Sequence, residues 1–178
     1  MIKETDLIGL PILKEDHEPL SYEIKDIIYC FKDFRILGLY LQQINSIKYT
    51  KFLPYTKIKN ITEEGILIYS INDIVGVDQI AEIKDAINNK PIIGYEIYSN
   101  TGEIIGVIKD ALLQIRSGKI LGFIMSEGLF DDLINGYSFL PLVEGINFYE
   151  YKIMLNNKDQ LKILPQQGGL KKMLGIDR

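Results

Sequence analysis

Three side chains or pairs in this sequence have the chemistry for catalysis or metal binding, yet each stands where its type is poorly placed to act. His17 is the only histidine and lies in the polar stretch 15–19, a solvated turn without an oriented partner. Cys30, the only cysteine, follows an apolar run, so we expect a core residue. Asp131 and Asp132 are adjacent, and neighbouring side chains on a strand point to opposite faces. We therefore assign no catalytic residue, no metal ligand and no cofactor.

One stretch of the chain has the character of a nucleic-acid binder, because it interleaves lysines with aromatic residues. Aromatic rings stack on bases while lysines meet phosphates. Two acids, Glu63 and Glu64, follow closely, so an ordinary solvated strand face is the competing interpretation. The candidate residues are Lys48, Tyr49, Lys51, Tyr55, Lys57 and Lys59.

The stretch 127–137 is unusually apolar for a loop, since loops normally face water. Its apolar residues recur at helical spacing between Gly128 and Gly136. Two interpretations stay open: a helical turn that folds down as a lid on the core, or an apolar patch that contacts a protein partner. The candidate partner-binding residues are Leu129, Phe130, Leu133 and Ile134.

The composition narrows the class of protein. The chain has 178 residues, of which 47% are apolar and 25% charged, as is typical of soluble globular proteins. A net charge of −4 excludes a strongly basic nucleic-acid binder. No apolar run is long enough to cross a bilayer, so we expect no stable membrane insertion. A single cysteine excludes an internal disulfide and fits a reducing cytoplasm.

The second half of the chain repeats the first. Five blocks match in order at shifts of 84 to 87 positions, and the shift changes only between blocks, where loops absorb insertions. We infer a duplicated unit of about 70 residues. The matched blocks are Ile8-Gly9 with Ile93-Gly94, Ile24-Lys25-Asp26 with Ile108-Lys109-Asp110, Ile36-Leu37-Gly38 with Ile120-Leu121-Gly122, Phe52-Leu53-Pro54 with Phe139-Leu140-Pro141, and Ile66-Leu67-Ile68 with Ile153-Met154-Leu155.

Each unit is predicted to consist of short strands. Gly102 and Gly118 lie in turns between apolar runs, because glycine readily takes the positive φ of a tight hairpin. Gly38 and Gly122 fall inside strands, where a missing side chain permits a bend or a close backbone approach. The repeated Asp26 and Asp110 are expected to accept backbone donors as part of the fold. Short strands, tight turns and interior glycines predict a small closed barrel.

The predicted fold class is therefore mainly all-β, with two tandem small β-barrels joined by a short helical connector. The first barrel is assigned to residues 1–71 and the second to residues 90–156. Residues 72–89 form the connector, with a short helix that Asp78 caps. Residues 157–178 form a C-terminal tail.

The second unit carries an ordered set of glycine-containing motifs, which are Ile93-Gly94, Asn100-Thr101-Gly102-Glu103, Gly106-Val107-Ile108-Lys109-Asp110, Gly118-Lys119-Ile120-Leu121-Gly122 and Leu140-Pro141. In this order they resemble the PRC-barrel domain over residues 90–156. That domain occurs in the photosynthetic reaction-centre H subunit and at the C-terminus of the ribosome maturation factor RimM. Two such units in tandem are similar to stand-alone proteins of low-GC Gram-positive bacteria.

The first unit departs from this pattern at its turns. The sequence Asp16-His17-Glu18-Pro19 replaces the turn that contains Gly102. Tyr22 stands where Gly106 stands, and the stretch 32–35 lacks an equivalent of Gly118. These departures bear on the hairpin geometry of the first unit and leave its barrel intact.

The resemblance implies docking, onto a ribosomal protein in the maturation factor and onto a membrane complex in the H subunit. We expect a non-catalytic docking or adaptor protein of the cytoplasm that acts through barrel surfaces on a protein partner. The alternative is an RNA- or ribosome-associated maturation factor. A further alternative is peripheral membrane attachment through the tail, by Leu170, Met173 and Leu174 with Lys171 and Lys172.

Overall fold

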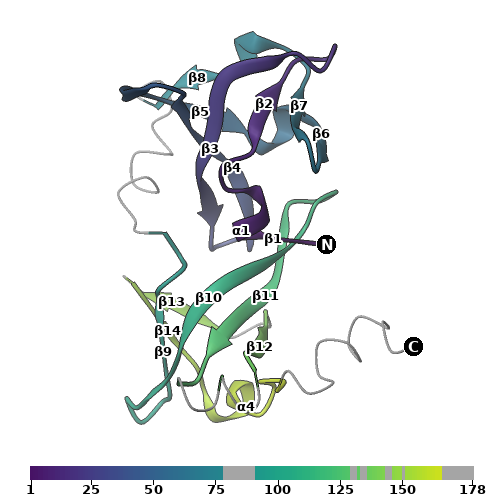
Figure 1. The fold of residues 1–178 in the computed structure, drawn as a ribbon. Helices are drawn as coiled ribbons and strands as arrows, with labels where there is room; N and C mark the ends of the chain where they lie inside the picture. Colours follow the sequence, from purple (N-terminus) through teal and green to yellow (C-terminus); the bar gives the residue numbers. More distant parts are fainter. Residues whose placement is uncertain (78–90, 129–131, 133–135, 143–145, 150, 166–178) are drawn as a thin grey trace, which may run out of the picture. The chain divides into compact units, whose positions relative to one another are not determined.

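The computed structural model describes residues 1–77, 91–128, 132, 136–142, 146–149 and 151–165. The chain divides into two compact units (Figure 1). The first comprises Met1–Asn89 together with Gln114–Lys119, and the second comprises Lys90–Leu113 together with Ile120–Arg178. Strands dominate both units, so the prediction of a mainly β fold is confirmed.

The first unit is built around a long hairpin of two strands, β3 (Pro19–Cys30) and β4 (Arg35–Gln43). Its sheet order is β6–β7–β2–β3–β4–β5–β8, and every pair is antiparallel except β2 with β7. Its other elements are β1 (Ile2–Lys3), α1 (Glu4–Leu7), β2 (Pro11–Leu13), β5 (Ser46–Pro54), the 3-10 turn η1 (Tyr55–Lys57), β6 (Ile58–Thr62), β7 (Gly65–Ile68), the 3-10 turn η2 (Ile71–Asp73) and β8 (Val75–Gly76).

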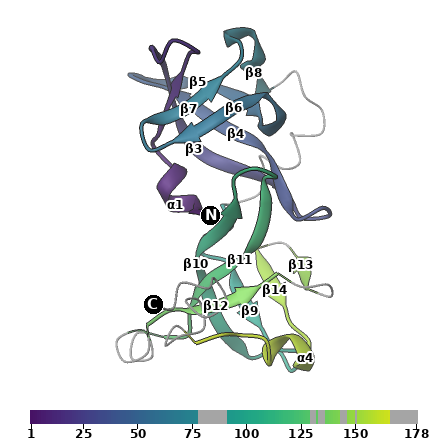
Figure 2. The same ribbon diagram turned by 90° about the vertical axis from the view of Figure 1, so that its right-hand side faces the viewer.

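The second unit has the strand order β13–β14–β9–β10–β11–β12. Its strands β9 and β14 are parallel, and Phe139 of β12 pairs with Leu164 as the next antiparallel bridge. Figure 2 shows β9, β10, β11 and β14 of this unit. Its elements are β9 (Glu96–Tyr98), β10 (Ile104–Gln114), β11 (Lys119–Ser126), β12 (Ser138–Pro141), β13 (Asn147–Tyr149), β14 (Lys152–Met154) and α4 (Asn157–Gln160).

The two units bury the same positions of the repeated blocks. Successive side chains of a strand point to opposite faces of the sheet, and in each unit the side chains on one face form the core. The buried pairs, all at most 1% exposed, are Ile12 with Ile97, Ile24 with Ile108, Leu39 with Phe123, Leu53 with Leu140, Ile66 with Ile153, and Ile68 with Leu155.

The strand glycines permit a close approach in both units, as the sequence predicts. A Cβ atom on Gly38 would collide with the ring of Phe52 and the carbonyl oxygen of Leu53. A Cβ atom on Gly122 would collide with the carbonyl oxygen of Leu140 and would lie 2.5 Å from the ring of Phe139. Each phenylalanine therefore packs over a glycine on the neighbouring strand.

The turns at His17 and Phe34 keep the backbone geometry of the matching turns at Gly102 and Gly118 despite their different residues. His17 has a φ of 66° and Gly102 has a φ of 86°. Phe34 has a φ of 51°, while the corresponding Gly118 has a φ of 65°. The left-handed conformation is thus retained where glycine is replaced, although it is unfavourable for residues with a Cβ atom.

The repeated aspartates accept backbone hydrogen bonds, as predicted. The N–H of Ile27 donates to Asp26 Oδ1 at 2.8 Å, and the N–H of Ala111 donates to Asp110 Oδ1 at 2.9 Å. Burial raises the pKa of the Asp26 carboxyl, against the opposing effects of this hydrogen bond and of Lys25. These side chains satisfy donors within long strands.

Two other expectations have different outcomes. The prediction that Cys30 is a core residue was wrong: it is only partly buried, and its thiol lies 3.6 Å from Asp33 Oδ2. Cys30 is the last residue of β3 and pairs with Arg35 of β4, so its side chain lies next to the turn that contains Asp33. The closed barrel remains a prediction, because the pairings given by the described residues form an open order in each unit.

The predicted connector, residues 72–89, is only partly described. Residues 72 and 73 belong to η2, Val75 pairs with Phe52 through β8, and Val77 packs against the Ile28–Phe52 cluster. The expected helix and its cap at Asp78 lie outside the described residues.

We predict that Gly38→Ala and Gly122→Ala each lower the free energy of unfolding by about 1 to 3 kcal/mol, because the added methyl group meets backbone and a packed ring. Urea denaturation followed by circular dichroism measures the change. Leu37→Ala, at a position 36% exposed, is the control and should cost less. A neutral effect of both alanine variants would show that the close approach is not tight.

Candidate functional site

A hollow on the first unit lies where β2 and β7 end. Ile12 pairs with Ile66 and Leu13 pairs with Leu67 in parallel register. Because both strands run in the same direction, the segments that follow them lie side by side. The hollow has a volume of about 500 Å³ and is lined by Lys14, Glu15, Asp16, Ile68, Tyr69, Ser70 and Ile71.

Two apolar side chains of the hollow are exposed. Ile68 is buried at 1% exposure, whereas Tyr69 is 62% exposed and Ile71 is 54% exposed. The backbone between them is fixed, because the Ser70 hydroxyl accepts a hydrogen bond from the N–H of Asn72 at 3.2 Å and caps η2. An aromatic and a branched aliphatic side chain exposed within three residues, beside a concave surface, are typical of an interaction site.

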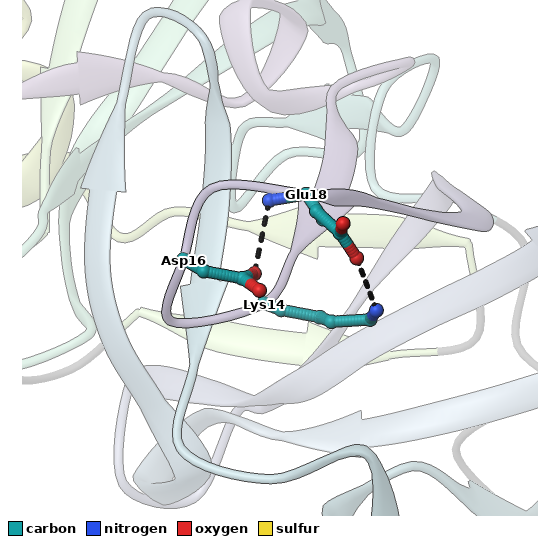
Figure 3. A network of polar contacts seen from close by, with 3 residues as sticks. All are labelled: Lys14, Asp16 and Glu18. Carbon is teal, nitrogen blue, oxygen red and sulfur yellow. Dashed lines mark hydrogen bonds and ion pairs between the residues drawn. The ribbon is translucent and has the colours of Figure 1, made fainter.

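Lys14, Glu15 and Asp16, which line the other side of the hollow, belong to a charged turn. Figure 3 shows the polar contacts of this turn. The Lys14 ammonium donates to Glu18 Oε2 at 2.5 Å, and the N–H of Glu18 donates to Asp16 Oδ1 at 3.2 Å. The hydrogen bond to Glu18 raises the pKa of Lys14. Both partners are exposed, so this ion pair orders the turn but contributes little to the stability of the unit.

His17 completes the turn in the left-handed conformation. Its N–H donates to the carbonyl oxygen of Lys14 at 3.0 Å, just as the N–H of Gly102 donates to Ser99 at 3.1 Å in the second unit. His17 Nδ1 lies 3.9 Å from Glu64 Oε2, so the 14–18 turn stands beside the turn between β6 and β7. Its side chain is 58% exposed, which confirms the solvated position expected from the sequence.

The corresponding corner of the second unit is polar. Leu155 and Asp159 match Ile68 and Asp73: each leucine or isoleucine is buried, and each aspartate pairs with a lysine. Between these landmarks the first unit has Tyr69-Ser70-Ile71-Asn72, whereas the second unit has the exposed residues Asn156-Asn157-Lys158. Between these landmarks, exposed apolar residues therefore occur in the first unit only; in the second unit the exposed apolar residue Leu161 follows two residues after Asp159.

Comparison with protein families identifies the second unit. The model of the PRC-barrel domain matches residues 84–161. Residues 84–161 form a PRC-barrel domain. No curated protein matches the chain.

The glycine motifs of the PRC-barrel domain have a structural explanation here. Gly94, Gly102 and Gly118 have φ values of 99°, 86° and 65°, which few residues other than glycine adopt without strain. Gly106 and Gly122 instead lie close to neighbouring strands. The glycines that resemble the PRC-barrel domain are thus explained by the backbone conformation and strand packing of the fold. They do not form a binding or catalytic site.

Two lysines of the predicted nucleic-acid stretch are paired with acids. Lys57 Nζ lies 3.2 Å from Asp73 Oδ1, and Lys59 pairs with Glu15. Lys51 lies in β5 opposite Gly76 and is partly buried. The side chains of Lys48 and Tyr49 lie outside the described residues. This stretch offers few uncompensated cations to phosphate.

Tyr55, the remaining aromatic candidate of this stretch, is engaged within the first unit. Its hydroxyl donates to the carbonyl oxygen of Ile115 at 2.5 Å, and its ring lies against Gly118. Burial raises the pKa of Tyr55 to about 12. A ring held in this way is not available for stacking on a base.

Of the apolar loop 127–137 in the PRC-barrel domain, the structure describes only residues 127, 128, 132, 136 and 137. Leu129, Phe130, Leu133 and Ile134 lie outside the described residues, so the lid and partner-contact interpretations both stay predictions. The N–H of Asp132 donates to Gly128 at 2.9 Å, and Ser126 donates to Asp132 Oδ2 at 2.5 Å. Asp131 also lies outside the described residues, as does the C-terminal tail from residue 166.

In the described part of the chain, no group of three or more histidine, cysteine, aspartate or glutamate side chains is arranged to hold a metal ion. No helix of that part is long and apolar enough to cross a membrane.

Sequence reasoning missed Tyr69 and Ile71. They continue the apolar run Ile66-Leu67-Ile68 of β7. A run of six apolar or small residues, as in 66–71, predicts a strand that is buried along its whole length. The repeat itself contained the signal, because the second unit turns polar directly after Leu155.

We predict that His17→Gly raises the free energy of unfolding by about 0.5 to 1 kcal/mol. The left-handed conformation costs a residue with a Cβ atom about 1 to 2 kcal/mol, and the greater freedom of unfolded glycine offsets part of that gain. The urea midpoint measures the change, and His17→Ala, which keeps the strain, is the control. A decrease in stability for His17→Gly would show that the His17–Glu64 contact outweighs the strain.

We predict a pH-dependent loss of stability that depends on Tyr55. Because the pKa of its hydroxyl is about 12 in the fold and 10.0 ordinarily, its stabilising effect is complete below pH 10 and is lost as the pH rises toward 12. Tyr55→Phe should cost about 1 kcal/mol at neutral pH and should lose less stability over that interval. Urea titrations at several pH values make the comparison. Equal losses in both proteins would contradict the assignment.

Proposed function

We propose that this chain is a non-catalytic docking protein, and that the first unit contacts a protein partner through the hollow at the ends of β2 and β7. The observation that carries the proposal is the exposure of Tyr69 and Ile71 beside that hollow. A few residues supply most of the binding energy at protein interfaces, and tyrosine is among the types enriched there. The polar residues at the same corner of the PRC-barrel domain show that the fold itself does not require apolar ones there.

The proposal includes a tandem architecture in which the first unit is a second, diverged copy of the PRC-barrel fold. Its support is the shared strand order, the parallel pairs β2–β7 and β9–β14, and the packing of Phe52 and Phe139 over Gly38 and Gly122. Duplication allows one copy to keep the fold while the other changes its surface. The proposed cytoplasmic location is supported by the single cysteine.

A protein partner is favoured over RNA because of charge. RNA binding depends on cations that are free to neutralise phosphates. In the described part of the first unit, Lys14, Lys57 and Lys59 each pair with a carboxylate. The RNA- or ribosome-associated alternative therefore has less support than a direct protein contact.

Site-directed photo-crosslinking in cells of the source organism tests the proposal. A photoreactive amino acid at position 69 should give discrete protein adducts of the full-length chain, identified by mass spectrometry. The control is the same amino acid at position 149, where Tyr149 is 55% exposed on β13 of the PRC-barrel domain.

The outcomes separate the proposed functions. Protein adducts from position 69 that are absent from position 149 support docking through the hollow. Adducts that ribonuclease removes would replace docking with the RNA-associated alternative. Equal labelling from both positions, or none from position 69, would contradict the proposal.

A further inference from the structure

We infer that the segment bound in this hollow is short and combines apolar side chains with lysine or arginine. The inference rests on the proposed function, because it specifies the chemistry of the partner at the same site. Three properties of the described residues carry it: the charge around the hollow, its exposed apolar side chains, and the lack of an open sheet edge at β2 and β7.

The charge around the hollow is negative. Asp16, Glu63 and Glu64 are exposed, and Glu64 has 80% of its side chain in water. Among the ion pairs of the described residues, the only one that involves these three acids is the contact of Glu64 with His17. A basic segment would meet uncompensated carboxylates here, whereas phosphates of a nucleic acid or an anionic membrane would be repelled.

The neighbouring lysines cancel only part of this charge, although Lys14 also interacts electrostatically with Asp16. Lys14 is held by Glu18, and Lys59 is held by Glu15. The two turns that carry these acids are adjacent, as the 3.9 Å separation of His17 and Glu64 shows. Asp16 thus belongs to the lining of the hollow, and Glu64 lies beside the turn that carries Asp16.

Tyr69 and Ile71 give the segment its apolar contacts. They stand on a capped backbone turn with Ile68 buried beneath them, so little conformational freedom is lost when they are covered. A volume of about 500 Å³ is within the range of sites that take a few side chains or a small ligand. An exposed acidic turn next to apolar contacts favours a segment in which apolar and basic residues are mixed.

Recognition occurs through side chains, and not through the addition of a strand. At this end of the sheet β7 already pairs with β2 on one side and with β6 on the other. β2 likewise pairs with β3 and β7. The backbone groups that strand addition needs are thus occupied, so sequence composition decides what binds.

Three synthetic peptides of equal length test the inference with the full-length chain. One alternates leucine and lysine, the second leucine and glutamate, and the third serine and lysine. Fluorescence anisotropy should give the leucine–lysine peptide a Kd at least about tenfold lower than either of the others, because only that peptide satisfies both the apolar and the acidic surface.

Variants locate the binding. The double variant Tyr69→Ser/Ile71→Ser should raise the Kd of the leucine–lysine peptide at least about tenfold. Asp16→Asn/Glu64→Gln should raise it by a smaller factor and reduce its dependence on salt. Tyr149→Ser, which removes an exposed tyrosine of the PRC-barrel domain, should leave it unchanged. All substituted side chains are exposed, and circular dichroism verifies the fold.

Three results would overturn the inference: tighter binding of the leucine–glutamate peptide, no binding of the leucine–lysine peptide, or equal binding by wild type and the Tyr69→Ser/Ile71→Ser variant. Each is distinguishable from failure of the docking proposal, which is decided by crosslinking from position 69. If position 69 gives protein adducts but the chain prefers the leucine–glutamate peptide, the docking proposal is supported. The partner segment would then be acidic instead of basic.

Discussion

Ile12 and Leu13 of β2 lie beside Ile66 and Leu67 of β7 in parallel register, and the candidate site depends on this pairing. Parallel strands end at the same edge, so the charged turn after β2 and the apolar corner after β7 must meet. The PRC-barrel domain has the same parallel pair in β9 and β14. In each unit, the fold thus places side by side the two segments that follow the parallel strands. The residue types in those segments decide whether this corner only contacts water or can bind a partner.

Much of the fold could be predicted from residues whose roles are local. Gly102 and Gly118 mark turns because their φ values are positive, and Gly38 and Gly122 mark close approaches because a Cβ atom has no room there. Because the chain contains the unit twice, each of these patterns could be compared with its counterpart in the other half. The turns of the first unit were harder to predict, because a histidine and a phenylalanine hold a conformation that composition alone assigns to glycine.

The candidate site itself could not be predicted, for a physical reason. An apolar residue at the end of a strand has the same sequence pattern whether it enters the core or remains in water, and exposure is decided by where the sheet ends. Tyr69 and Ile71 continue a buried run, yet η2 turns them outward. Cys30 shows the same effect at the end of β3. Lys57 and Lys59 did not indicate a nucleic-acid site for a related reason. Their acidic partners, Asp73 and Glu15, lie far from them in the sequence, so the pairing is visible only in the structure.

Hydrogen exchange of the full-length chain, measured by mass spectrometry with and without the leucine–lysine peptide, tests the central claim most directly. Covering the hollow should slow exchange in residues 14–18 and 69–74 and leave residues 156–160 unchanged, because residues 156–158 of the second unit are polar where the first unit has Tyr69 and Ile71. Slower exchange confined to residues 127–137, or an equal response of both corners, would contradict the assignment of binding to the first unit.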